Sequence, residues 1–280
     1  MRRLHYLPFA GLLLAALNAA PVGAEPKGAD QPPPLAPHRA VYELTLSRSG
    51  GVGGVANARG RIAFEFTGSA CDGYVQNFRQ ITELNPAEGD SKVSDMRSAT
   101  FESGDARQFR FKIETKTDNA RSEDVDGRAQ KSTQTQLAID VAKPRPAHRD
   151  VPETVLFPTE HVRHLIAAAA AGEQIVETKV FDGSGDGQKV FDSMAVIGKA
   201  RTEPSTEKGA QSAALKALRR WPVTLSYFDF GKKDHSPAYV LGFDLYENGV
   251  SGALVLDYGD FALKGEMTEL TLSPAQNCGK

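Results

Sequence analysis

The sequence has 280 residues, of which 33 are lysine or arginine, 35 are aspartate or glutamate and 40% are hydrophobic. This near balance of charge disfavours a protein whose main task is to bind nucleic acid or another polyanion. Two cysteines in a chain of this length exclude a disulfide-dense miniprotein and any metal site built mainly from thiolates.

The N-terminus has the three parts of a secretory signal peptide. Arg2 and Arg3 give a positive start, residues 7–17 form a short apolar run, and Val22-Gly23-Ala24 is a small-residue cleavage site. The pattern predicts cleavage after Ala24 and export from the cytoplasm. Removing 24 residues from 280 leaves 256, and the loss of two arginines makes the net charge −4. No later apolar run approaches the roughly 18 residues of a membrane span, so we expect a soluble mature protein.

Residues 25–37 carry five prolines and predict a disordered leader. From His38 onward the sequence is dominated by short runs of period two, which indicate β-strands. In the clearest run, Phe109, Phe111 and Ile113 alternate with charged residues, so one face of this strand is expected to be buried and the other solvated. Strands are predicted at about 39–48, 62–66, 74–84, 92–102, 109–114, 134–141, 175–181, 188–198, 222–230, 238–247, 250–257 and 261–272.

Two glycines carry topological information. Asn248-Gly249 between two apolar runs is typical of a two-residue hairpin turn, so the last strands are expected to be antiparallel. Apolar residues of the final run change from odd to even positions near Gly265, which predicts a β-bulge or bend there. A single mainly-β domain covering residues 38–280 follows from these patterns.

One segment has helical rather than strand periodicity. Residues 158–171 place Val162, Leu165 and Ile166 at helical spacing, begin at Pro158 and end before Gly172, a favourable C-terminal cap. Five consecutive alanines allow its backbone to approach a sheet closely, so we expect this helix to cover a concave face. Residues 201–212 are predicted to be a loop, followed by a short helix at 213–220.

Cys71 and Cys278 are the strongest local signal. In a chain exported to an oxidising compartment, an even number of cysteines with no competing motif predicts one disulfide. Closing a loop of roughly 200 residues stabilises the fold by on the order of 5 kcal/mol in the chain-entropy model. The alternative is two unrelated free thiols. A redox role is disfavoured because there is no Cys-x-x-Cys motif.

Two motifs resemble metal sites without completing them. His161 and His164 lie three apart on the predicted helix and lack a third ligand, so both are expected to face solvent or the helix edge. Asp182 to Gly187 resembles half of a calcium loop, but Ser193 stands where a bidentate glutamate is required. A glycine-rich hairpin explains the second motif without an ion. No metal and no cofactor is expected.

The sequence also lacks the usual signatures of catalysis. No Gly-x-Ser-x-Gly nucleophile elbow, P-loop or Gly-x-Gly-x-x-Gly motif is present, and the acidic residues are scattered without an evident pair. We therefore expect a protein that is not an enzyme and has no catalytic residues. A hydrolase acting on envelope polymers is the third hypothesis, after two hypotheses based on binding.

Several ordered motifs together resemble the EipB-like cell-envelope integrity family of α-proteobacterial periplasmic proteins, over about residues 36–279. The motifs are His38-Arg39-Ala40-x-Tyr42, Gly60-Arg61, Cys71-Asp72-Gly73-Tyr74, Leu156-Phe157-Pro158-Thr159-x-His161, Phe181-Asp182-Gly183-Ser184, Trp221-Pro222-Val223, Leu245-Tyr246-Glu247-Asn248-Gly249-Val250-Ser251 and Asp257-Tyr258-Gly259-Asp260-Phe261.

The resemblance implies a long, highly curved antiparallel sheet, a β-spiral or half-barrel similar to lipoprotein carriers, with one central helix and a Cys71–Cys278 disulfide. It implies a role in envelope integrity and stress resistance, no catalytic residues, and a periplasmic tetratricopeptide-repeat protein or an envelope component as partner. Our leading hypothesis is thus a soluble periplasmic binding or scaffold protein. The alternative is a carrier or chaperone for a lipid or lipoprotein acyl chain in the concave sheet.

Overall fold

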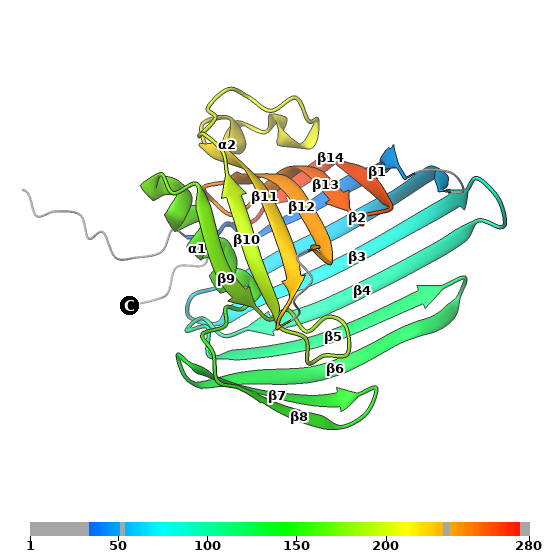
Figure 1. Ribbon diagram of the computed structural model, residues 1–280. Helices are drawn as coiled ribbons and strands as arrows, with labels where there is room; N and C mark the ends of the chain where they lie inside the picture. The colour runs from blue at the N-terminus through cyan, green and yellow to red at the C-terminus, as the bar shows by residue number, and fades with distance from the viewer. Residues whose placement is uncertain (1–33, 51–53, 232–235, 275–280) are drawn as a thin grey trace, which may run out of the picture. The chain divides into compact units, whose positions relative to one another are not determined.

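The computed structural model describes residues 34–50, 54–231 and 236–274 (Figure 1). The strands are β1 His38–Ser49, β2 Val55–Ser69, β3 Gly73–Pro86, β4 Lys92–Glu102, β5 Gln108–Thr117, β6 Ala120–Thr133, β7 Gln136–Lys143, β8 Ala147–Val151, β9 Ile175–Val180, β10 Phe191–Ile197, β11 Arg220–Asp229, β12 Tyr239–Tyr246, β13 Ser251–Asp257 and β14 Phe261–Leu272. The helices are α1 Pro158–Ala171, α2 Ala213–Lys216 and the 3₁₀ turn η1 Gly209–Gln211.

The described strands form a 14-stranded antiparallel sheet with the order β8-β7-β6-β5-β4-β3-β2-β1-β14-β13-β12-β11-β10-β9. The sheet consists of two meanders that meet where β1 pairs with β14. The sheet is curved, so that β10 to β12 cross over one face of β1 to β4 (Figure 1). We call the face that lines this curve the inner face and the opposite one the outer face. The mainly-β, curved antiparallel architecture expected from the sequence is confirmed.

Side-chain alternation explains why the sheet curls. On β5 the buried residues Phe109, Phe111 and Ile113 alternate with exposed ones, as predicted. Equivalent inward residues on β2 and β11, such as Phe66 and Trp221, lie in one core cluster although their strands are far apart in the sheet order. Curling therefore removes the apolar inner face from water, at roughly 25 cal/mol per Å² of apolar area buried.

Two additional segments complete the core. Helix α1 buries Leu165, Ile166 and two of its alanines against the inner face of β9 to β12, so the covering role predicted for it is confirmed. Residues 181–190, between β9 and β10, place Phe181 and Val190 among the inward residues of β5 to β7. A third cluster links β1, β2 and β14 with Leu215 of α2.

The boundaries of α1 agree with the sequence. Pro158 is its first residue, and Gly172 ends it with a φ of 84°, a left-handed conformation that glycine adopts at little cost. The amide groups of Gly172 and Glu173 donate to the carbonyls of Ala169 and Ala168. The helix predicted at 213–220 is shorter than expected, because α2 ends at Lys216 and β11 begins at Arg220.

The final strands differ from the prediction in one detail. Gly249 has a φ of 86° in an antiparallel β12–β13 hairpin, as predicted. The change of side-chain face on β14 is real but lies at Thr268 rather than at Gly265: Tyr42 is paired with Met267 and Val41 with Glu269, so Thr268 is the extra residue.

The leader expected at 25–37 is described only from residue 34. Leu35 is buried in the core, 7% exposed, and Ala36 donates a backbone hydrogen bond to Asn248. These last residues before β1 are therefore part of the domain. The signal peptide lies outside the described residues. Within the described part of the chain, no helix has the length and apolar character needed to cross a membrane.

Two buried carboxylates fix elements that the ladder alone does not hold. Glu102, at the end of β4 and 2% exposed, accepts hydrogen bonds from the amides of Thr159 (2.7 Å) and Glu160 (2.9 Å) in the first turn of α1. It thereby satisfies two of the amides that a helix start leaves unpaired. Burial raises the pKa of Glu102 to about 7, and the two amide donors oppose this shift.

Glu207 anchors the segment 201–212, which the sequence predicted to be a loop. Its Oε2 accepts from the amide of Ala253 (2.8 Å) and its Oε1 from the amide of Met267 (2.7 Å). The β13–β14 ladder begins at the pair Leu254–Gly265. The carboxylate therefore accepts hydrogen bonds from two amides that lie just outside this ladder. Gly252 is required next to it, because a Cβ there would lie 2.5 Å from Oε2.

Glu207→Ala should lower the free energy of unfolding by roughly 2 to 6 kcal/mol, because it leaves two amides without an acceptor at about 1 to 3 kcal/mol each. Urea unfolding of the parent and the variant measures the difference. Glu203→Ala, an exposed change in the same segment, is the control and should cost less than about 0.5 kcal/mol. Equal effects of the two changes would contradict the anchoring role of Glu207.

Glu102→Gln should alter the pH dependence of stability. Since the folded-state pKa of Glu102 is raised from 4.5 to about 7, its contribution is fully present below about pH 4.5 and is lost as the pH rises toward 7. The stability of the parent relative to Glu102→Gln should therefore fall by on the order of 3 kcal/mol between pH 4.5 and 8. Urea unfolding at both pH values tests this, with Glu88→Gln in the exposed β3–β4 turn as control. A difference that does not change with pH would show that Glu102 keeps its ordinary pKa.

Candidate functional site

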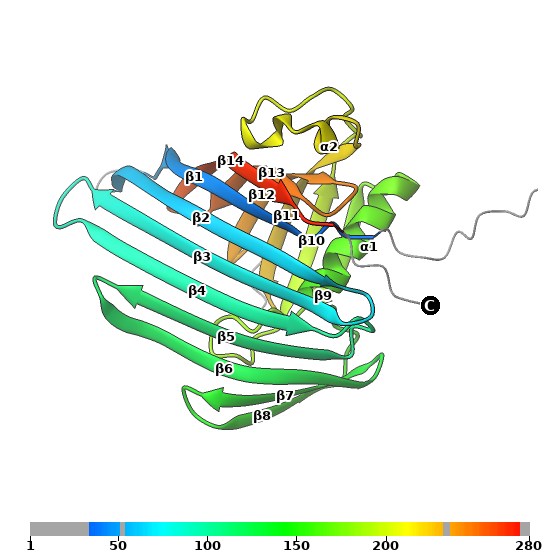
Figure 2. The same cartoon turned by 180° about the vertical axis from the view of Figure 1, so that it is seen from behind.

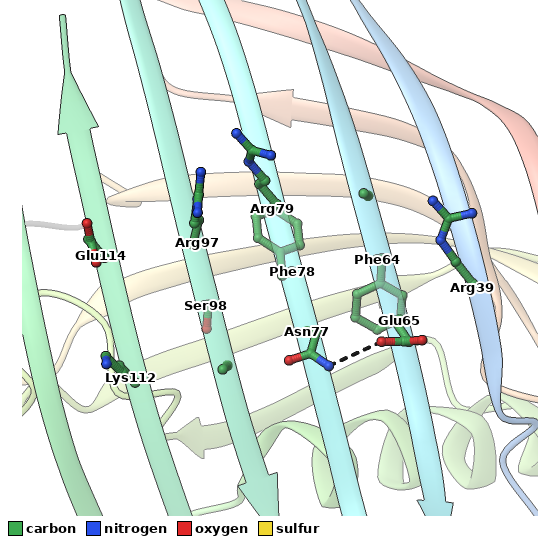
Figure 3. Close-up of a pocket in the computed structure, with 12 residues that line it drawn as sticks. Arg39, Phe64, Glu65, Asn77, Phe78, Arg79, Arg97, Ser98, Lys112 and Glu114 are labelled. Atoms are coloured by element: carbon green, nitrogen blue, oxygen red, sulfur yellow. Dashed lines mark hydrogen bonds between the residues drawn. The ribbon is translucent and has the colours of Figure 1, made fainter. Parts of the chain in front are cut away.

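A groove of about 410 Å³ crosses the outer face of β1 to β5 (Figure 3). Figure 2 shows this face of β2 to β6 free of any covering helix. The residues that line the groove are Arg39, Ala63, Phe64, Glu65, Asn77, Phe78, Arg79, Arg97, Ser98, Ala99, Lys112 and Glu114.

The groove exists because small side chains stand among long ones. Ala99 is paired with Asn77 on β3 and with Lys112 on β5, and Ala63 is paired with Arg79. Side chains of one face that are paired across strands lie about 5 Å apart. An alanine flanked by arginine and lysine therefore leaves a depression whose floor is apolar and whose walls are charged.

The charges of the groove are only partly neutralised. Arg79 makes two hydrogen bonds to Asp95 (3.0 and 2.9 Å), and Arg97 shares the same carboxylate (3.1 Å). The hydrogen bond from Arg79, assisted by Arg97, lowers the pKa of Asp95 to about 2, so this carboxylate is ionised at neutral pH. Arg39 and Lys112 make no ion pair with any described residue.

A second groove, of about 550 Å³, continues along the outer face toward β7 and shares Ala99 and Lys112 with the first. Its remaining lining residues come from β5 to β7 and are Arg110, Phe111, Asp126, Gly127, Arg128, Asp140, Val141 and Ala142. The two grooves thus form a surface that runs from β1 to β7, with Ala99 at the junction. Side chains must recognise a ligand on such a surface, because the backbone groups of these non-edge strands are already hydrogen-bonded to neighbouring strands.

The residues predicted from the sequence as site residues do not lie in these grooves. Cys71 lies in the turn between β2 and β3, where its amide donates to Ser69 Oγ (3.2 Å). Cys278 lies outside the described residues, so the Cys71–Cys278 disulfide stays a prediction.

The expectation that both histidines of α1 face solvent or the helix edge is wrong for His161. His161 is 3% exposed and faces inward with Leu165, one turn later, while His164 is exposed. Burial lowers the pKa of His161 to about 4, so its ring is neutral at physiological pH. The two rings point to different environments and do not form a shared metal site. The spacing of four to Leu165 was the signal that could have placed His161 inside.

The glycine-rich segment 182–187 serves packing. The Asp182 and Asp186 carboxylates accept hydrogen bonds from the amides of Ser184 and Gln188, two residues later, as in turns. Gly183 packs so closely on Phe111 that a Cβ would lie 2.4 Å from its ring. Among the described residues there is no group of three or more histidine, cysteine, aspartate or glutamate side chains suited to hold a metal ion.

Comparisons with known proteins agree with the fold. The family model described as EipB-like matches residues 29–274. The chain is 37% identical over 239 residues to the cell envelope integrity protein EipB of Brucella abortus strain 2308, covering 85% of this chain and 84% of that protein.

A solved structure from Brucella abortus also matches this chain. It is a β-barrel-like protein of a domain of unknown function, and it superposes with a TM-score of 0.80 at 35% identity, covering 86% of this chain and 99% of that one. The match extends through both meanders and the helix between them. The chain therefore belongs to the EipB-like family.

Proposed function

We propose that this protein is a periplasmic factor that maintains the integrity of the cell envelope by binding rather than by catalysis, and that the outer groove is its binding surface. The observation that carries the proposal is the groove itself: a concave, charged surface on a face that none of the described helices covers (Figures 2 and 3). The printed name of the Brucella relative, a cell envelope integrity protein, supports the biological setting.

The sequence supports the cellular location. The signal peptide ending at Ala24 is the basis for proposing export to the periplasm, where an envelope component or a tetratricopeptide-repeat protein is the expected partner. The non-enzymatic role rests on the sequence, which lacks catalytic motifs, and on the relative's name, which describes integrity and no reaction.

The alternative of an acyl-chain carrier has less support. A carrier of this kind needs an open, apolar concavity. In the described part of the chain the inner face is occupied by α1, by residues 181–190 and by three clusters of buried side chains. The two described grooves lie on the outer face and are lined by arginine, lysine and carboxylate groups.

Ala99→Trp should abolish the function while leaving the fold intact, because it fills the groove at an exposed strand position where an aromatic residue is well tolerated. In a deletion strain sensitive to detergent and cell-wall antibiotics, the parent gene should restore resistance and Ala99→Trp should not, at equal protein levels. Thr45→Trp, at an exposed position of β1 outside the groove, is the matched control and should restore it.

Each outcome of this experiment is informative. A deletion strain with unchanged resistance would contradict the envelope role. Full complementation by Ala99→Trp would contradict the assignment of the outer groove as the binding surface.

Cys71→Ser and Cys278→Ser should each lower the midpoint of thermal unfolding in the absence of reductant. The physical reason is the proposed bridge, which closes a loop of roughly 200 residues and restricts the unfolded chain. This restriction stabilises the fold by on the order of 5 kcal/mol. Dithiothreitol should lower the midpoint of the parent to that of the variants and leave the variants unchanged. If neither substitution moves the midpoint, the bridge is absent or does not contribute to stability.

A further inference from the structure

Four cationic side chains surround Ala99 at the junction of the two outer grooves. Arg97 precedes Ala99 by two residues on β4, and Lys112 is paired with Ala99 on β5. Arg79 is paired with Arg97 on β3, and Arg110 is paired with Phe101, the next outward residue of β4. Direct neighbours on one face lie about 5 Å apart and diagonal ones about 7 to 8 Å, so all four side chains are long enough to reach the space above Ala99.

The negative charge around Ala99 does not balance these four cations. Asp95 is shared by Arg79 and Arg97. Glu114 is the β5 partner of Arg97 and lines the groove, but it lies beside Lys116 (3.4 Å) and Arg121 (3.6 Å), which offset its charge. Arg110 stacks on the Phe101 ring (5.0 Å), and Lys112 has no ion pair with a described residue, although Asp126 is opposite it. With Asp95 and Asp126 set against the four cations, about two positive charges are left on a chain whose net charge is −2.

We propose that the groove at Ala99 binds a phosphate group. A phosphate ester carries up to two negative charges and three acceptor oxygens, which suits an excess of about two cations better than the single charge of a carboxylate. Guanidinium groups bind phosphate through two parallel hydrogen bonds, and three of the four cations are arginines. A groove of about 410 Å³ accommodates the phosphate together with part of the molecule that carries it.

This inference rests on the proposed function in one respect, namely that the outer groove is a binding surface. The phosphate is provided either by a lipid headgroup or by a soluble phosphate ester, and the same groups of the protein recognise both. The experiment must therefore contain a soluble probe and a membrane probe.

The test uses the mature chain at 0.1 M salt, where charges more than about 10 Å apart are screened. Titration calorimetry with inorganic phosphate measures the soluble probe, with succinate as a dicarboxylate comparison. Cosedimentation with phosphatidylcholine vesicles, with and without 20 mol% phosphatidic acid (about one lipid in five), measures the membrane probe. Arg97→Ala/Lys112→Ala removes two cations from the site, and Arg59→Ala/Lys264→Ala removes the same two residue types from exposed outer positions flanking Thr45.

The parent should bind at least one probe saturably, and Arg97→Ala/Lys112→Ala should weaken that binding at least about tenfold while the control changes it less than about twofold. Ala99→Glu, which places a carboxylate among the cations at an exposed position, should abolish binding without lowering the thermal midpoint. Binding of inorganic phosphate alone assigns the site to soluble phosphate esters. Binding of phosphatidic acid vesicles that the double variant loses assigns it to lipid headgroups.

Three results would overturn the proposal. These are no binding to either probe, equal losses in the double variant and its control, and binding of succinate as tight as that of phosphate. If phosphate binding fails but Ala99→Trp still fails to complement the deletion strain, only the ligand assignment is wrong. If phosphate binds but Ala99→Trp complements fully, the site is real and the proposed function of the groove is wrong.

Discussion

The pairing of β1 with β14 is the contact on which the rest of the architecture depends. Each strand pairs with a neighbour in sequence on its other side, so this ladder joins a meander of eight strands to one of six. It connects residues more than 200 positions apart, such as Tyr42 and Met267. Closing a loop of that length costs entropy before any contact forms, which predicts slow, late formation of this ladder during folding.

The closure determines what each face of the sheet can do. With β14 beside β1, the second meander crosses the first and their apolar faces meet, so that Phe66 and Trp221 share a core. The remaining inner space is occupied by α1, whose start is held by Glu102, and by the segment that contains Phe181. The outer face of β2 to β5 is left to solvent, which explains why most of its outward residues are polar or charged and why the described grooves lie there.

The strands could be predicted from the sequence more reliably than the candidate site. Strand β5 was predictable because its own alternation is strong, whereas β6 was not predicted. Its inward residues are small, Val125 and Ala129 around Gly127, and the Phe111 ring of β5 covers that glycine so closely that a Cβ would lie 2.5 Å away. The apolar surface of β6 is thus supplied by its neighbour. Strand β8 is equally weak, with five residues and one fully buried side chain, Val151.

The charged groove could not be predicted because it depends on register between strands. The sequence shows that Lys112 faces outward, but its position beside Ala99 follows only from the β4–β5 ladder. Cys278 illustrates a different limit, since its partner was predicted from compartment and cysteine number and lies outside what the structure describes. His161 was misjudged because a histidine was assumed to be exposed, although its spacing from Leu165 places it on the buried side of α1.

The regularity of the central ladders makes the outer groove suitable for recognition. Register shifts occur where β1 meets β14, where β12 meets β13, where β6 meets β7 and near the ends of β2 and β5, but the β3–β4 and β4–β5 ladders are uninterrupted. Arg79, Arg97 and Lys112 therefore start from fixed positions on paired strands. A site built on regular strands needs less reordering when a ligand binds than a site built on loops. The bulges that bend the sheet are placed away from β4, so curvature and a regular binding surface coexist in one sheet.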